Sequence, residues 1–116
     1  MTDKLLFDVI DKIATITFNN PEKLNAFTTE MLEAYEQRLE ECRTRDDIWA
    51  IIITGAGRGF CAGGDTGRMG ADTPPTPAEI KSGLWDLVQL ISLKMAEIDK
   101  PIIAAVNGVA VGAGMD

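Results

Sequence analysis

The chain has 116 residues, of which 46% are hydrophobic and 25% charged, a composition typical of a folded globular domain and not of a disordered segment. A net charge of −7 at pH 7 argues against a surface for nucleic acid or for an anionic membrane, because either would need clustered Lys and Arg. Histidine is absent, and Cys42 and Cys61 are too far apart for a CxxC unit, so we expect no metal site. The N-terminus has no signal-peptide core and no apolar run is long enough to span a membrane, which predicts a cytoplasmic protein.

The first third of the chain predicts a hairpin followed by a helix. Apolar residues alternate on both sides of Asp11-Lys12, which is typical of two antiparallel strands joined by a turn. Thr28 is a suitable cap for a helix whose first turn carries acidic residues. Apolar residues then recur at helical spacing, and we interpret this stripe as core, with Cys42 a buried residue; the stripe comprises Met31, Tyr35, Leu39 and Cys42.

The middle of the chain predicts a buried strand and a second helix. The run IWAIIIT, residues 48–54, is continuously apolar and β-branched, as in a parallel strand covered on both faces. The second helix is expected to begin after Thr76, because Thr76 and Glu79 form a capping box around Pro77. Its expected apolar face consists of Ile80, Leu84, Leu87, Ile91 and Met95. A further strand, IIAAV, follows Pro101.

Each of the two apolar strands ends in a glycine-rich loop, GRGFCAGGD at residues 57–65 and NGVAVGAGMD at residues 107–116. In open parallel sheets ligands bind beyond the carboxyl ends of the strands, so both loops could direct backbone N–H groups into one cleft. The alternative is that glycine only supplies positive φ in two turns.

The residues in these loops exclude several kinds of chemistry. A phosphate-binding P-loop needs GxxxxGK[ST], and no such Lys-Ser/Thr pair follows the glycines. A dinucleotide fingerprint would have glycine where Phe60 stands and would pass directly into a helix, so it remains only an alternative. A histidine-activated nucleophile is impossible within the chain, and Cys61 has no adjacent base. The remaining interpretation is a pair of backbone donors that form an oxyanion hole.

Three segments resemble the crotonase family, also called the enoyl-CoA hydratase/isomerase superfamily: PEKLNAF at 21–27, IIITGAGRGFCAGGD at 51–65 and KPIIAAVNGVAVGAGMD at 100–116. The resemblance covers essentially the whole chain and implies an α/β fold of the crotonase type, a spiral of repeated ββα units with helices outside stacked sheets. Residues 1–116 would be the N-terminal part of a single core domain, whose C-terminal half is absent from this chain. Members of the family bind acyl-CoA thioesters and stabilise an enolate between two backbone N–H groups.

The resemblance also implies particular site residues. The two oxyanion donors would be the N–H of Gly64, in CAGGD, and the N–H of Ala113, near the start of the following helix, while Asp116 would be a catalytic carboxylate. Hydratases usually have Glu at the position of Asp116, and dienoyl-CoA isomerases have Asp. The residues implied to line the CoA groove are Lys23, Leu24, Ala26, Ala62, Asp65, Thr66 and Gly112. Lys23 could equally be an ordinary solvated lysine, and Arg58 and Arg68 are weaker candidates.

Taken together, the implied function is an acyl-CoA enzyme, an enoyl-CoA hydratase (a lyase) or an enoyl- or dienoyl-CoA isomerase of fatty acid metabolism. No separate cofactor is expected, because coenzyme A is part of the substrate, and the complete protein would be a homotrimer or hexamer. Two alternatives remain: a nucleotide-binding module that uses the glycine loops for phosphate, and a non-catalytic fragment that serves only assembly.

Overall fold

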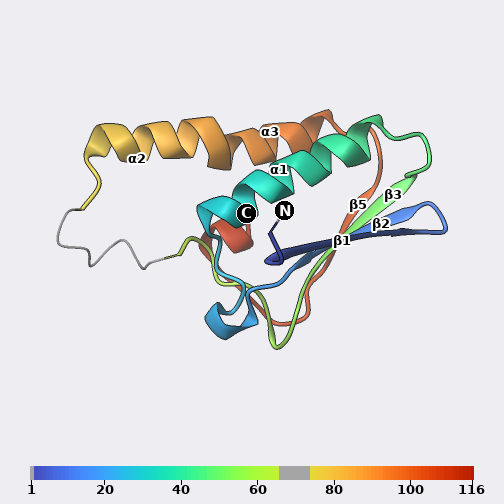
Figure 1. Cartoon of the computed structure of the whole chain (residues 1–116), viewed down its shortest axis with the longest axis horizontal. Helices are drawn as coiled ribbons and strands as arrows, with labels where there is room; N and C mark the ends of the chain where they lie inside the picture. The colour runs from blue at the N-terminus through green and yellow to red at the C-terminus, as the bar shows by residue number, and fades with distance from the viewer. Residues whose placement is uncertain (1, 66–73) are drawn as a thin grey trace.

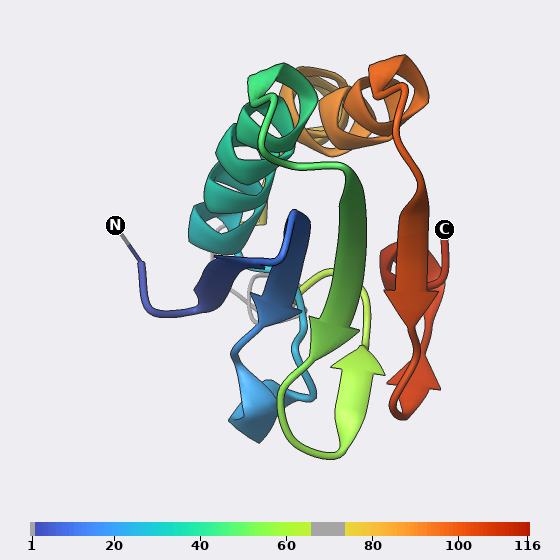
Figure 2. The same ribbon diagram turned by 90° about the vertical axis from the view of Figure 1, so that its right-hand side faces the viewer.

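The computed structural model describes residues 2–65 and 74–116, and its main sheet has four strands in the order β1-β2-β3-β5, with helices on one face (Figures 1 and 2). The strands of this sheet are β1 (Leu5–Ile10), β2 (Ile13–Phe18), β3 (Ala50–Gly55) and β5 (Ile102–Ala105). β1 and β2 are antiparallel, whereas β3 runs parallel to both of its neighbours. The hairpin and the parallel pairing are therefore confirmed, whereas coverage of β3 on both faces is not, because its buried residues alternate and the helices lie on one face of the sheet (Figure 2).

The hairpin closes on the turn that the sequence indicates. Asp11 and Lys12 have φ of +51° and +70°, the left-handed backbone that two-residue hairpin turns require. In β3, Ile51 and Ile53 are buried between the helices and the neighbouring strands. Burial of alternate residues fixes the register, because a shift by one residue would turn these side chains to solvent.

Helix α1 (Thr29–Thr44) begins and packs as predicted. The Thr28 hydroxyl accepts a hydrogen bond from the backbone N–H of Met31 over 3.2 Å. The predicted stripe is buried against the sheet; its buried members are Met31, Ala34, Tyr35, Leu39 and Cys42. At the other end of the helix, Lys100 Nζ donates to the carbonyl oxygens of Cys42 and Arg45 over 2.6 and 2.7 Å, which satisfies acceptors that the helix end leaves open.

The second helical segment starts as predicted but is not one regular helix. Thr76 N–H donates to Glu79 and Glu79 N–H donates to Thr76, which confirms the capping box. The segment then divides into α2 (Pro77–Gly83), the π-helical turn η3 (Leu84–Val88) and α3 (Gln89–Glu97). The expectation of a continuous apolar face is wrong: Ile80 is 49% exposed, because α2 extends past the end of α1, whereas η3 and above all α3 pack against α1 (Figure 1).

A smaller, two-stranded parallel sheet lies beyond the ends of β3 and β5. It consists of β4 (Gly59–Cys61) and β6 (Val109–Ala110), and the chain continues from β6 into the 3₁₀ turn η4 (Gly112–Gly114). The element order therefore repeats a pair of strands followed by helical structure, the ββα repeat that the sequence implies. In the described residues, no helix is long and apolar enough to cross a membrane.

Candidate active site

The two glycine-rich loops lie against each other, backbone to backbone. β4 pairs with β6, and the N–H of Val111 donates to Cys61 O over 3.0 Å. Gly63 has φ of +98°, and a Cβ built there would lie 2.9 Å from Val111 O and 3.7 Å from Ala113 N. Only glycine fits such a close approach in left-handed backbone, so the glycine explains how the loops meet.

The backbone N–H groups of Gly64 and Ala113 are both left unpaired by this arrangement. Gly64 lies in a single parallel bridge with Phe27, in which Phe27 N–H donates to Gly63 O and Asp65 N–H donates to Phe27 O. This pattern does not use the N–H of Gly64. Within residues 2–65 and 74–116, neither Gly64 N–H nor Ala113 N–H donates to a protein acceptor. Two donors on abutting loops are therefore available to a ligand oxygen.

The second loop leads into a turn of 3₁₀ helix at the position where the sequence suggested the start of a helix. In this turn Gly114 N–H donates to Val111 O over 3.0 Å, and Asp116 N–H donates to Gly112 O over 3.1 Å. Gly112 has φ of +56°, and a Cβ built there would have no described atom within 4 Å. The geometry of the turn thus comes from its own hydrogen bonds.

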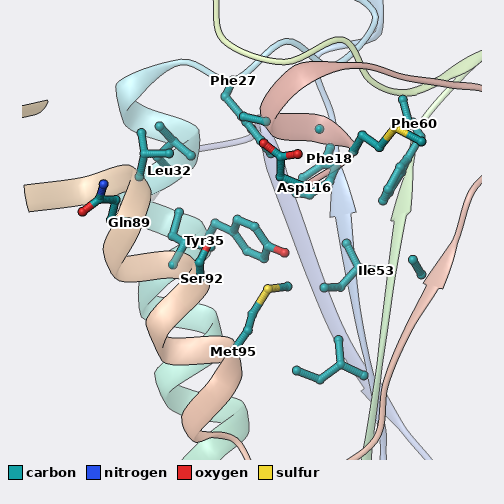
Figure 3. Close-up of a pocket in the computed structure, with 18 of the residues that line it drawn as sticks. Phe18, Phe27, Leu32, Tyr35, Ile53, Phe60, Gln89, Ser92, Met95 and Asp116 are labelled. Atoms are coloured by element: carbon teal, nitrogen blue, oxygen red, sulfur yellow. The ribbon is translucent and has the colours of Figure 1, made fainter. Parts of the chain in front are cut away.

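A cavity of about 820 Å³ opens between the helices and the sheet, next to the second loop (Figure 3). Its apolar walls include Phe18, Phe27, Leu32, Ile53, Phe60, Met95, Ile102 and Ala104. The polar side chains among the described lining residues are those of Tyr35, Gln89, Ser92 and Asp116. An elongated apolar ligand with a few polar groups would suit a space of this kind.

Asp116 supplies the only carboxylate among the described residues that line this cavity. Its side chain lies beside Phe18 and Phe27 at one end of the space (Figure 3). Ala113, three residues before Asp116, lines the same cavity, so the structure brings two of the three predicted catalytic residues to one space. Gly64 is not among the lining residues, although its loop touches the loop of Ala113.

The residues expected to line the CoA groove form two adjacent segments. Leu24 O accepts a hydrogen bond from Ala62 N–H over 3.0 Å, and Lys23 Nζ lies 3.3 Å from an Asp65 carboxylate oxygen. Lys23 remains 56% exposed in this ion pair. Ala26 is only 8% exposed, so its side chain is part of the core.

The remaining groove candidates are dispersed. Gly112 lies in the η4 turn of the second glycine-rich loop. Asp65, which pairs with Lys23, belongs to the first glycine-rich loop. Arg58 is exposed, at the tip of the first loop. Thr66 and Arg68 lie outside the described residues.

Asn25, within PEKLNAF, is a residue whose role the sequence did not reveal. It is fully buried with φ of +60°, its side-chain oxygen accepts from Asn20 N–H, and its amide nitrogen donates to Ala56 O and Gly59 O over 2.9 and 2.8 Å. A buried amide with all these partners fixes the loop that leads into β4. The available signal was an asparagine between the apolar residues Leu24 and Ala26.

The two cysteines are structural, as the sequence predicted for Cys42. Cys61 Sγ donates to Asn25 O over 3.1 Å. Burial raises the pKa of both thiols, that of Cys42 to about 11. Because the thiolate is the reactive form, neither side chain is suited to be a nucleophile. In the described part of the chain, His, Cys, Asp and Glu form no cluster that could hold a metal ion.

Comparisons with known proteins agree with this description. The Enoyl-CoA hydratase/isomerase family model matches residues 9–116. Over 98% of its length the chain is 38% identical to 1,2-epoxyphenylacetyl-CoA isomerase from Escherichia coli (strain K12), of which it covers 44%. Again over 98% of its length, the chain is 37% identical to a probable enoyl-CoA hydratase from Mycobacterium tuberculosis, of which it covers 43%. The chain thus spans less than half the length of these relatives.

Solved structures show the same similarity. A probable enoyl-CoA hydratase from Mycobacterium smegmatis matches 98% of this chain with a TM-score of 0.86 and 27% identity, and 45% of that chain is covered. A probable enoyl-CoA hydratase/isomerase from Mycobacterium abscessus matches 97% with a TM-score of 0.80 and 34% identity, with 42% of that chain covered. The family match over nearly all residues and the shared fold lead to one conclusion: this chain has the crotonase-type α/β fold and belongs to the enoyl-CoA hydratase/isomerase family.

Proposed function

We propose that this protein binds acyl-CoA thioesters and acts as an enoyl-CoA hydratase or an enoyl- or dienoyl-CoA isomerase. The observation that carries the proposal is the pair of unpaired backbone N–H groups, at Gly64 and Ala113, on two abutting loops. Family membership and relatives named for CoA thioesters support the same class of substrate. The glycine loops would therefore serve as an oxyanion hole and not as a phosphate cradle.

The proposed role of the two N–H groups follows from where negative charge develops during the reaction. When a proton leaves the carbon next to a thioester carbonyl, the carbonyl oxygen becomes an enolate oxygen and gains negative charge. Two N–H groups fixed by the backbone stabilise that charge without reorganising, and each such donor contributes about 2.7–4 kcal/mol in comparable oxyanion holes. In this proposal Gly64 and Ala113 hold the oxygen, and Asp116 moves a proton or orients water at the acyl group.

Coenzyme A would lie along the segment around Lys23 and its neighbour at Asp65. Lys23, Leu24, Ala26, Ala62, Asp65, Thr66 and Gly112 are the proposed contacts. Lys23 is the exposed cation of this set, so it is suited to a phosphate group of coenzyme A. We further propose that no separate cofactor is required, that the enzyme acts in the fatty acid metabolism of the cytoplasm, and that it assembles as a homotrimer or hexamer.

Calorimetry with two ligands tests the proposal. We expect acetoacetyl-CoA to bind, because it presents a thioester carbonyl and a partly enolised acyl group, and we expect NAD not to bind. Binding of NAD without binding of acetoacetyl-CoA would overturn the proposal in favour of a nucleotide-binding module. Binding of neither ligand would favour a non-catalytic role.

A further inference from the structure

Asn107, the first residue of the second glycine-rich loop, holds the segment that leads from β3 into β4. Its amide nitrogen donates to Gly57 O and Gly59 O over 3.0 and 3.1 Å, and its side-chain oxygen accepts from Gly55 N–H over 3.1 Å. A Cβ built at the next residue, Gly108, would overlap a backbone oxygen of the first loop, so the two backbones are in contact here. One side chain therefore ties the two loops together where the second one begins.

The small sheet that follows has few contacts of its own to fix how its strands are aligned. β4 has three residues and β6 has two. The register shifts between Gly59 and Cys61, because two steps along β4 match one step along β6. Short strands with such an irregularity specify their register weakly. The hydrogen bond from Asn107 to Gly59 O lies at one end of the irregular stretch, and the bond from Val111 N–H to Cys61 O lies at the other end.

The two proposed oxyanion donors come directly after this sheet. Gly64 lies three residues after the end of β4, and Ala113 lies three residues after the end of β6. The bridge to Phe27 holds Gly64 to an earlier segment and not to the second loop. A shift of β4 along β6 would therefore move one N–H group relative to the other. Both groups must lie within hydrogen-bond distance of the same oxygen to stabilise its charge, so the alignment of this sheet affects catalysis.

We propose that Asn107 is a positioning residue of the oxyanion hole. By holding Gly59 it fixes the register of β4 on β6, and with it the separation of the N–H groups of Gly64 and Ala113. This inference rests on the proposed function, because it assumes that these two groups bind one oxygen. Asn107 takes no part in proton transfer, since both amide hydrogens and the side-chain oxygen are engaged within the protein.

Two substitutions at Asn107 and one control variant test this role. Asn107→Asp keeps an acceptor for Gly55 N–H but loses both donors, and Asn107→Ala loses all three hydrogen bonds. The control is Lys100→Met, because Lys100 precedes β5 whereas Asn107 follows it, and the Lys100 ammonium group donates to carbonyl oxygens at the end of α1. Thermal unfolding measures the stability of each protein, and kcat and KM are measured with an enoyl-CoA substrate.

We expect both Asn107 variants to fold, because the residue is exposed and water can replace its partners. Their kcat should fall by about 10- to 10²-fold, as for a small misplacement of a catalytic group, with KM within about threefold of the parent. Lys100→Met should keep kcat within about threefold of the parent even where it lowers stability as much, since it leaves the donors in place.

Bound acetoacetyl-CoA gives a second measurement that does not depend on turnover. Its enolate absorbs ultraviolet light differently from the keto form, so absorbance reports how much of the bound ligand is enolate. A correctly aligned pair of donors favours the enolate, because its oxygen carries more negative charge than a carbonyl oxygen. We expect the Asn107 variants to bind a smaller fraction as enolate than the parent and Lys100→Met do.

A double-mutant comparison shows whether Asn107 acts through Gly64. In the Gly64→Pro background, which lacks that N–H, Asn107→Ala should change kcat by less than about threefold. The proposal is overturned by an undiminished effect in that background, by a parental kcat in the folded Asn107 variants, by an equal loss of kcat in Lys100→Met, or by unfolding of both Asn107 variants. If the parent neither binds acetoacetyl-CoA nor turns over the enoyl-CoA substrate, the proposed function itself fails, and this inference fails with it.

Discussion

The side-chain amides of Asn25 and Asn107 both donate a hydrogen bond to the carbonyl oxygen of Gly59, over 2.8 and 3.1 Å. Each amide also holds a second carbonyl of the same loop, Ala56 O for Asn25 and Gly57 O for Asn107. Two segments that are far apart in the sequence therefore fix the loop between β3 and β4 from two sides. β4 leads directly to Gly63 and Gly64, so this network positions one of the proposed donors.

Replacing Asn25 should destabilise the fold substantially. Asn25→Ala removes a fully buried amide together with its hydrogen bonds to Ala56 O and Gly59 O, and alanine is strained at φ of +60°. We expect the free energy of unfolding to fall by about 2–4 kcal/mol, measured by urea denaturation.

Two further variants separate the causes of that loss. Asn25→Gly tolerates the positive φ but still lacks the hydrogen bonds, so it should recover only about 1 kcal/mol relative to alanine. Asn107→Ala, at an exposed residue, should cost less than Asn25→Ala because water can replace its partners. Full recovery by glycine would show that backbone strain, and not hydrogen bonding, accounts for the importance of Asn25.

The ion pairs of Glu40 predict a dependence of stability on pH. Hydrogen bonds from Arg43 and Lys94 lower the pKa of Glu40 from 4.5 to about 2. A carboxyl whose pKa is lower in the folded state stabilises the fold above its unfolded pKa, and this contribution is lost as the pH falls from about 4.5 towards 2. Glu40→Gln should therefore be less stable than the parent at pH 7, and the difference should shrink across that acid range.

Urea denaturation of parent and variant at several pH values, at low and high salt, measures this difference. The Glu40 side chain is 38% exposed, so salt should reduce its contribution. Glu33→Gln is the matched control, because Glu33 lies exposed on the same helix and forms no ion pair with a described residue. A difference that stayed constant from pH 7 to pH 2 would contradict the role assigned to the Glu40 pairs.

Asp116→Asn should lower kcat by about 10²-fold or more with little loss of stability, if Asp116 is the acid or base that we propose. Asparagine has nearly the same shape but cannot exchange the proton. Rates on 2-enoyl-CoA and 3,5-dienoyl-CoA substrates, together with thermal unfolding, measure both effects. Rates within a few-fold of the parent on both substrates would leave Asp116 with only a structural role at the turn.

The elements that sequence predicted well are those fixed by local rules. Thr28 and Thr76 cap helices where their spacing indicates, and the turn at Asp11 closes the hairpin. The π-helical turn at Leu84–Val88 was not predictable, because it interrupts a stretch whose apolar spacing is helical throughout. Exposure of Ile80 was missed for a related reason: spacing defines a face of a helix but does not say how far the neighbouring elements extend.

In the candidate site, too, the features set by local sequence were predictable and those set by tertiary contacts were not. The glycine loops indicated which backbone approaches closely, and Gly63 lies against the second loop. That Tyr35 borders the cavity was not predictable, because helical spacing predicts only that its ring is buried. Asn25 was hidden because its partners, Ala56 and Gly59, are brought to it only by the tertiary fold.

Gly64 provides the most direct test of the central claim, that its backbone N–H stabilises an enolate oxygen. A Cβ built at Gly64 would have no described atom within 4 Å, so Gly64→Ala should fit and keeps the N–H, whereas Gly64→Pro removes it. The bridge to Phe27 uses the flanking residues and does not use this N–H, so both variants should fold, which thermal unfolding can verify.

The measurement is kcat for an enoyl-CoA substrate in the parent, Gly64→Ala and Gly64→Pro proteins. Loss of one oxyanion donor lowers kcat by about 10²–10³-fold, so we expect Gly64→Pro to lose at least that much and Gly64→Ala to stay within about tenfold of the parent. A folded Gly64→Pro protein with the parental kcat would contradict the account and would leave this loop as a turn with no part in catalysis.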